Sequence, residues 1–179
     1  MDEYKIKVSL DSGELKLNFL EFIQHFYLVF YLLLIPILLM FFGLVDLFKE
    51  VNNPLKEGEI WFYIIPPILS ILFFFYQKNK LKFKIISTNL SRSELNKIIM
   101  KVGNELGWKF TENKHNVIVA ERCDNIIFSI GGERITILFY KNNLYINSIC
   151  DPSKRISISS GGRNRENISR LVNEIVISG

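Results

Sequence analysis

Two long runs without a charged side chain constrain this chain more than any other feature of its sequence. No Asp, Glu, Lys or Arg occurs from Phe22 to Val45 or from Ile60 to Gln77. The core of the first run, FYLVFYLLLIPILLMFFGLV, covers about 30 Å as a helix, which is enough to cross the hydrocarbon core of a bilayer. The second run is shorter, with Trp61, Tyr63 and Tyr76 near its ends, where amphipathic rings settle at an interface.

These runs predict a transmembrane hairpin, residues 22–77, with helices at about 24–46 and 60–77 and an external loop at 47–59. The alternative is a pair of core helices in a soluble protein, but such helices seldom lack a polar face over so long a stretch. A cleaved signal peptide is not expected, because about 25 polar and mixed residues precede the first run and no small-residue cleavage pattern follows it.

Lysines near the helix ends predict the orientation. Three precede the first helix, two lie between the helices and four follow the second: Lys5, Lys7 and Lys16; Lys49 and Lys56; Lys78, Lys80, Lys82 and Lys84. Basic residues collect on the cytoplasmic side of a membrane. We therefore expect a multi-pass protein of the bacterial inner (cytoplasmic) membrane, with both termini and the C-terminal domain in the cytoplasm.

An N-terminal arm, residues 1–21, precedes the first helix. Tyr4–Leu10 and Glu14–Phe19 alternate apolar and polar residues around a glycine-containing turn, which predicts a β-hairpin. A two-stranded hairpin is marginal by itself, so we expect it to join the C-terminal domain or to lie on the membrane surface. The alternative is an interfacial helix near residues 14–25.

Residues 78–179 predict a cytoplasmic α+β domain, with a mostly antiparallel sheet covered on one face by two helices. Ser91 and Glu94 form a capping box at the start of the first helix, and Gly107 suits its C-terminal end. The apolar stripes of the two helices are Leu95, Ile98, Ile99, Val102 and Leu106, and Ile168, Leu171, Val172, Ile175 and Val176.

Strands are predicted from alternation and from turn residues. Lysines alternate with Leu81, Phe83 and Ile85 after the second apolar run, and Gly131-Gly132 and Asn142-Asn143 suit tight connections. The further strand candidates are Trp108–Thr111, Asn116–Glu121, Ile126–Ile130, Arg134–Tyr140, Leu144–Cys150 and Arg155–Ser159.

Catalytic and metal-binding motifs are missing from the sequence. There is no HExxH, GxSxG, Walker A or dinucleotide pattern and no zinc-type Cys/His cluster, so we expect no enzyme, no metal and no cofactor. The competing hypothesis, an enzyme acting on a lipid-linked substrate, would need His115, Asp124 or Asp151 and a thiol in one pocket. His25 is expected to be an interfacial ring. Cys123 and Cys150 are expected to be buried structural thiols, with a disulfide as the alternative.

The apolar runs offer little for transport. Ser70 is the polar side chain well inside them, and Pro36 and Pro66-Pro67 are expected to kink the helices rather than to form a substrate site. A small transporter or channel subunit would have to be an oligomer, since two helices cannot enclose a path. We keep it as the alternative function.

Charge is unevenly divided along the chain. Residues 78–179 hold 17 Lys and Arg against 9 Asp and Glu, a net of +8, whereas residues 1–77 hold 5 against 9, a net of −4. A basic domain beside a membrane is attracted to anionic lipid. The expected partners are the bilayer, anionic lipid headgroups or a protein. Nucleic acid is not expected, since no recognition motif accompanies the basic residues.

The segment SSGGRNRENI carries the candidate site. Gly162 and Asn164 lie where a strand ends and a helix opens, and Arg163 and Arg165 lie at the positive end of that helix, where cations are disfavoured. Glu166, water and salt, or a phosphate or carboxylate partner could offset them. The simpler interpretation is a plain turn with solvated arginines. The candidate anion or lipid-headgroup contacts are Gly162, Arg163, Asn164, Arg165, Lys78, Lys80, Lys82 and Lys84.

Ser157–Ile168, with its spaced serines and the G-x-N-R-x-x-I opening of the last helix, resembles the C-terminal pattern of small uncharacterised bacterial α+β domains. The layout is similar to that of two-helix bacterial membrane proteins with a cytoplasmic α+β domain. The resemblance implies a domain type and no activity. We expect a membrane-tethered, non-catalytic interaction or accessory module that binds a partner or an anionic lipid surface.

Overall fold

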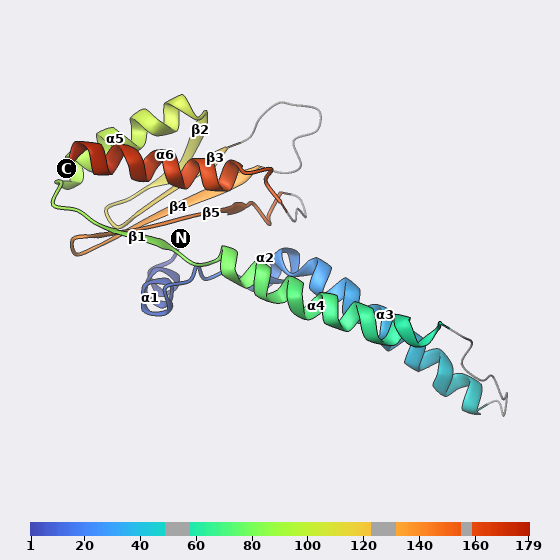
Figure 1. Ribbon diagram of the computed structural model, residues 1–179. Helices are drawn as coiled ribbons and strands as arrows, with labels where there is room; N and C mark the ends of the chain where they lie inside the picture. Colours follow the sequence, from blue (N-terminus) through green and yellow to red (C-terminus); the bar gives the residue numbers. More distant parts are fainter. Residues whose placement is uncertain (49–57, 123–131, 155–158) are drawn as a thin grey trace. The chain divides into compact units, whose positions relative to one another are not determined.

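The computed structural model describes residues 1–48, 58–122, 132–154 and 159–179 (Figure 1). The chain divides into two compact units. One combines Met1–His25 with Lys80–Gly179, and the other is Phe26–Asn79. The first unit is an α+β fold, as the sequence predicts, and the second consists of two long apolar helices.

A five-stranded antiparallel sheet forms the centre of the first unit. Its strand order is β1-β5-β4-β3-β2. Strands β2 to β5 therefore each pair with the next strand in the chain, and β1 pairs with the outer side of β5. The strands are β1 (Lys84–Ser87), β2 (Trp108–Asn113), β3 (Val117–Arg122), β4 (Glu133–Tyr140) and β5 (Asn143–Cys150).

Two helices, α5 (Arg92–Glu105) and α6 (Arg163–Ser178), lie side by side on one face of this sheet, as predicted (Figure 1). Their apolar stripes and the inward-facing strand residues make one core, with Ile99, Ile137 and Leu171 fully buried. Burying a side chain of this size stabilises the fold by about 1.5–3 kcal/mol at most. The packed stripe on α6 fixes the place of its N-terminal turn against the sheet.

The start of α5 confirms the predicted capping box. The Ser91 hydroxyl accepts from the Glu94 amide at 3.3 Å, and a Glu94 carboxylate oxygen accepts from the Ser91 amide at 2.8 Å. Gly107 follows the helix with a φ of +69°, a conformation that glycine adopts at little cost.

The predicted hairpin in the N-terminal arm is wrong. Residues Glu3–Ser12 form a helix, α1, and Gly13 ends it with a φ of +68° instead of turning a hairpin. The second half of the predicted hairpin is extended but pairs with the residues that follow the apolar helices, since Glu14 bridges Lys82. Leu15 and Leu17 are buried in this arrangement. A two-stranded hairpin by itself could not bury them, which explains why this segment docks on the sheet domain instead. The alternative of a helix within 14–25 holds for α2 (Phe19–His25).

Residues Met1–His25 contact the sheet face opposite α5 and α6. Arg134 on β4 ion-pairs with Glu21, and Glu112 on β2 ion-pairs with the Met1 ammonium. Ile135 points to the helices, so its neighbour Arg134 points to the other face. The Asn147 amide, also on that face, donates to the carbonyls of Lys80 and Lys82 at 2.9 and 3.0 Å.

Several predicted boundaries shift. Four predicted strands are present, with ends moved by one or two residues. The candidate at 126–130 and residues 155–158 of the last candidate lie outside the described ranges, as do Cys123, Asp124 and Gly131. The β4–β5 turn is Lys141-Asn142 rather than Asn142-Asn143, because Tyr140 pairs with Asn143. The alternating strand expected from Lys78 onward begins only at Lys84, because the preceding helix continues to Lys80.

The second unit contains α3 (Tyr27–Phe48) and most of α4 (Ile60–Lys80), and both are long and apolar enough to cross a membrane. Each runs through its prolines, Pro36 in α3 and Pro66-Pro67 in α4, without a break. Only 11% of the Tyr27–Leu44 window and 17% of Ile60–Lys80 are buried. The multi-pass expectation therefore rests on two candidate spans in the described chain.

Candidate functional site

The helix α6 begins after two glycines whose backbone conformation requires glycine. Gly161 and Gly162 have φ of +59° and +93°, where a side chain would be strained. The first turn is then held by the Gly162 carbonyl, which accepts from the Glu166 amide at 3.0 Å, and by the Ser160 hydroxyl, which accepts from the Asn164 amide at 3.1 Å. This turn places Arg163, Asn164 and Glu166 next to the end of the sheet, where they contact strand residues.

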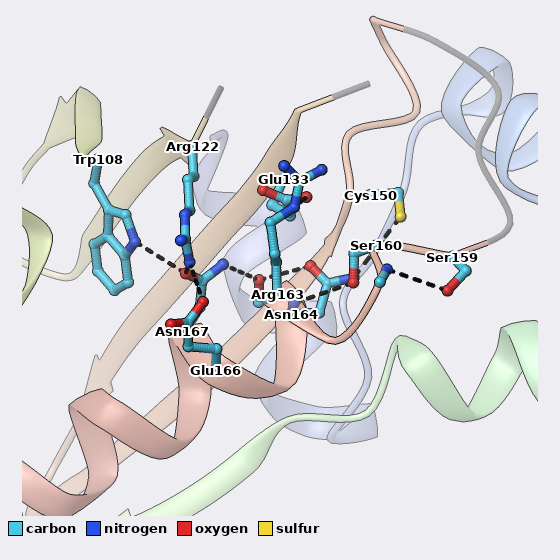
Figure 2. Close-up of polar contacts among 12 residues, drawn as sticks. Trp108, Arg122, Glu133, Cys150, Ser159, Ser160, Arg163, Asn164, Glu166 and Asn167 are labelled. Atoms are coloured by element: carbon cyan, nitrogen blue, oxygen red, sulfur yellow. Dashed lines mark hydrogen bonds and ion pairs between the residues drawn. The ribbon is translucent and has the colours of Figure 1, made fainter. Parts of the chain in front are cut away.

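Arg163, the first residue of α6, ion-pairs with Glu133 at the start of β4 (Figure 2). The Nε to Oε1 distance is 2.8 Å, and the Glu133 side chain is fully buried. The anion that offsets Arg163 at the positive end of the helix is therefore a carboxylate of the same chain. The solvated-arginine interpretation is wrong for Arg163, whose Nε is used within the domain.

Glu166, which the sequence suggested as a partner for the two arginines, pairs with a third arginine. Its carboxylate accepts from Arg122 Nη1 on β3 at 2.7 Å. The Arg122 side chain is only 12% exposed, and the ion pair lies at the end of β3, next to the first turn of α6 (Figure 2). Arg165 is exposed and has no ion pair within the described part of the chain, so its charge is free for a partner.

A chain of buried amides and hydroxyls continues from these ion pairs into the core (Figure 2). Asn167 Oδ1 accepts from Trp108 Nε1 at 3.1 Å and from Arg122 Nη1 at 3.0 Å, while its Nδ2 donates to Ser148 Oγ at 3.1 Å. The Ser148 hydroxyl donates to Asn164 Oδ1 at 2.9 Å. Asn164 is thus a structural group of the domain, not a free donor for a ligand.

Cys150 lies at the end of this network. It is a buried free thiol, 7% exposed, and the Asn164 amide lies 3.8 Å from its sulfur. This agrees with the structural role that the sequence predicts for it. The disulfide alternative involves Cys123, which lies outside the described ranges.

The groups that an enzyme would need do not come together among the described residues. Asp151 is buried and uses Oδ1 to accept from the Ser153 amide at 3.0 Å and hydroxyl at 2.8 Å. His115 lies just before the start of β3. Cys150 pairs with Glu133 on β4, which in turn pairs with Arg122 at the far end of β3. At ~3.3 Å per residue the two ends lie on the order of 20 Å apart. Asp124 is not described, and no group of three possible metal ligands occurs in the ranges that are.

The lysine run of the sequence is divided by the structure. Lys82 and Lys84 are exposed at the β1 edge, and Lys78 is exposed in the last turns of α4. Lys80 is half-buried, and its carbonyl accepts from Asn147. Lys78 belongs to the apolar unit, whereas Lys82, Lys84 and Arg165 belong to the α+β unit. We call Lys82, Lys84 and Arg165 the exposed basic residues.

Sequence reasoning missed Glu133, Arg122 and Asn167 as members of the site. A pattern was present for two of them. Glu133 shares the inward parity of Ile135 and Ile137 on β4, and Asn167 continues the apolar stripe of α6 one turn before Leu171. A polar residue in an apolar stripe indicates a buried hydrogen-bonding group. Arg122 lies at a strand end and gave no comparable indication.

Comparison of the chain with protein-family models, with curated proteins and with solved structures found no match. The resemblance of Ser157–Ile168 to small bacterial α+β domains therefore stays a prediction.

Proposed function

We propose that this chain is an integral membrane protein of the bacterial inner membrane whose helical hairpin tethers a non-catalytic interaction module. The observation that carries the proposal is the exposure of α3 and α4. Most of their described Leu, Ile and Phe side chains are exposed, for example Phe41, Phe62 and Leu72, each about 60% exposed. An apolar surface of this extent needs a lipid or protein cover. Core helices of a soluble domain would already be buried.

Two contacts within the second unit support the hairpin. The Ser70 hydroxyl of α4 donates to the Val29 carbonyl of α3 at 3.0 Å, and the rings of Phe26 and Phe74 lie 5.3 Å apart. Moving back along the chain from Val29 in α3 to Phe26, just before that helix, corresponds to moving forward along α4 from Ser70 to Phe74. That order is the one expected of antiparallel neighbours.

The exposed basic residues would form the contact surface. Lys82 and Lys84 follow shortly after α4, where the chain would leave the bilayer, and each basic residue near an anionic leaflet contributes on the order of 1 kcal/mol of attraction. Arg163 and Asn164 are left out of this surface because both are bound within the domain. The alternative function, an oligomeric transporter or channel subunit, gains no support from Ser70, whose hydroxyl is already used between the helices.

Cysteine labelling in intact cells tests the tether and its orientation. In a background with both native cysteines replaced by serine, Lys97→Cys on the exposed face of α5 should react with a membrane-impermeant maleimide only after lysis. Glu57→Cys, in the loop outside the described residues, should react before lysis. The protein should also stay in the pellet after alkaline carbonate washing. Release by carbonate would contradict the membrane tether, and labelling of Lys97→Cys in intact cells would contradict the orientation.

Lipid selectivity tests the contact surface independently. Full-length protein reconstituted with spin-labelled lipids should prefer phosphatidylglycerol to phosphatidylcholine. Lys82→Glu, Lys84→Glu and Arg165→Glu together should lower that preference at least about threefold. A matched triple reversal at Lys97, Lys101 and Lys109, away from α4 in the sequence, is the control. Equal effects of the two triple variants would remove the assignment of this surface.

A further inference from the structure

A pocket of about 290 Å³ lies at the end of the sheet where the β2–β3 and β4–β5 turns meet the start of α5. It is separate from the α6 network, because its strand residues lie at the ends of β4 and β5 opposite to Glu133 and Cys150. Two of its lining side chains are cationic, Arg92 and Lys141, and none of its described lining residues is Asp or Glu. The remaining polar lining is mostly amide and hydroxyl groups, from Thr88, Asn89, Asn116, Asn142 and Asn143.

Arg92 is held rigidly by neutral groups. Its Nε donates to the His115 carbonyl at 3.2 Å, its Nη2 to the Lys114 carbonyl at 3.0 Å and its Nη1 to Asn96 Oδ1 at 2.7 Å. Its guanidinium carbon lies 3.3 Å from the centre of the Phe139 ring. These contacts fix the plane of the guanidinium, and they leave two of its five N–H groups unused.

Other arginines of the domain are neutralised by glutamates. Arg122, Arg134, Arg163 and Arg170 each form an ion pair with a Glu. Arg92 is half-buried and has no carboxylate partner in the described chain, and burial lowers its pKa from the ordinary value. The nearest acid on its own helix, Glu94, does not line the pocket and is occupied by the Ser91 cap. A partly desolvated cation beside a pocket without acids is a place where a bound anion is stabilised.

Lys141 supplies a second charge from another element. It lies in the β4–β5 turn with a φ of +53°, its ammonium is 5.3 Å from the Tyr140 ring centre, and it forms no ion pair with a described residue. Lys141 is therefore a lining residue of the same pocket as Arg92, although it comes from a different element. Together the two cations match a ligand with close to two negative charges.

We propose that this pocket binds a small soluble phosphate monoester, with Arg92 and Lys141 holding the phosphate oxygens and the neighbouring amides contacting the rest of the ligand. A phosphate monoester carries about −1.5 to −2 charges near pH 7, which suits two cations better than a single carboxylate does. The volume, about 290 Å³, lies just below the usual range for ligand sites and favours a small ligand. The inference does not depend on the membrane surface proposed above.

Thermal unfolding of the full chain in phosphatidylcholine nanodiscs, with inorganic phosphate as the probe, tests the proposal. A ligand that binds the folded state raises the melting temperature in a saturable way. Phosphate should raise it beyond chloride or acetate of equal ionic strength. Lys141→Asn removes one charge while Asn tolerates the positive φ of the turn, and it should weaken the apparent phosphate affinity at least about fivefold. Lys97→Gln, which removes a charge on α5 outside the pocket, should leave the affinity unchanged.

Three outcomes would overturn the proposal. One is a phosphate response no larger than that of chloride, and another is an equal response to acetate. The third is equal affinity in Lys141→Asn and Lys97→Gln. Nanodiscs containing phosphatidic acid distinguish the source of the phosphate group. The response to added phosphate should persist in them, whereas its loss would assign the pocket to a lipid headgroup and overturn the soluble ligand.

Discussion

At the scale of single residues, Asn167 connects more of the buried polar network than any other side chain drawn in Figure 2. Its amide joins Trp108 on β2, Arg122 on β3 and Ser148 on β5, so three strands are tied to one helical turn. The residue is fully buried, and each of its partners would lose a hydrogen bond without it. Unmet buried donors cost more than the bonds contribute when formed.

We therefore expect Asn167→Ala to lower the free energy of unfolding by about 2–4 kcal/mol. Denaturant unfolding followed by Trp108 fluorescence in a Trp61→Phe background would measure it. Asn173→Ala is the matched control, because Asn173 is exposed on the same helix, and its effect should stay within about 0.5 kcal/mol. Similar losses in the two variants would show that the buried network does not account for the change, since alanine favours a helix more than asparagine does.

At the scale of elements, two glutamates contribute ion pairs to the attachment of Met1–His25. Burial alone would raise the pKa of Glu21, but hydrogen bonds from Arg134 and the Asn18 amide, with the charges of Arg134 and Lys5, leave the pKa below its ordinary value of 4.5. Burial also opposes the shift at Glu112, where Lys114 and the Met1 ammonium lower the pKa below 4.5. A carboxyl group with a lowered folded-state pKa binds protons more readily in the unfolded state.

The sign of the pH effect follows. The stabilisation from Glu21 and Glu112 is fully present above the ordinary pKa of 4.5 and is lost as the pH falls through the lowered folded-state values. We expect α1 and α2 to lose hydrogen-exchange protection below about pH 4, after correction for intrinsic rates, before the helices α5 and α6 do. Glu21→Gln with Glu112→Gln should reduce the protection already at pH 7 and flatten its pH dependence. Simultaneous loss in all four helices would show that these pairs do not act locally.

At the scale of the whole molecule, the α+β unit is not continuous in sequence. The apolar unit is inserted between its two segments, Met1–His25 and Lys80–Gly179. The core cluster consists of residues after Lys80, with Met1–His25 attached to the other sheet face. A unit with its own core is expected to fold when the inserted helices are removed.

Replacing Phe26–Asn79 by a flexible 20-residue Gly/Ser linker, which spans about 25 Å, should give a soluble protein with native near-ultraviolet circular dichroism. Residues 80–179 alone should be less stable, because the sheet face under Met1–His25 is then exposed. Size exclusion without detergent and thermal unfolding would test both. Aggregation of the linked version, or equal stability of the two, would contradict this division of the chain.

Much of the architecture could be predicted because it depends on interactions between residues close in sequence. The capping box of α5 joins residues three apart, the stripes of α5 and α6 repeat every three to four residues, and the charge-free runs of α3 and α4 are continuous. The antiparallel sheet followed from alternation and short turns. The N-terminal arm was mispredicted because its alternation also fits a helix, and docking on a sheet formed by distant residues selects between the two.

What the sequence by itself determined is therefore the division into two apolar helices and an α+β domain, and the placing of a helix start at Gly161–Arg163. Only the tertiary structure decided the state of the charges at that start. The partner of Arg163 is Glu133, on a different element and far away in the chain, and no local spacing identifies it. Antiparallel register and helix packing bring such groups together, and these depend on the whole core at once. The same packing left Arg92, which no motif indicated, as the half-buried cation beside a pocket.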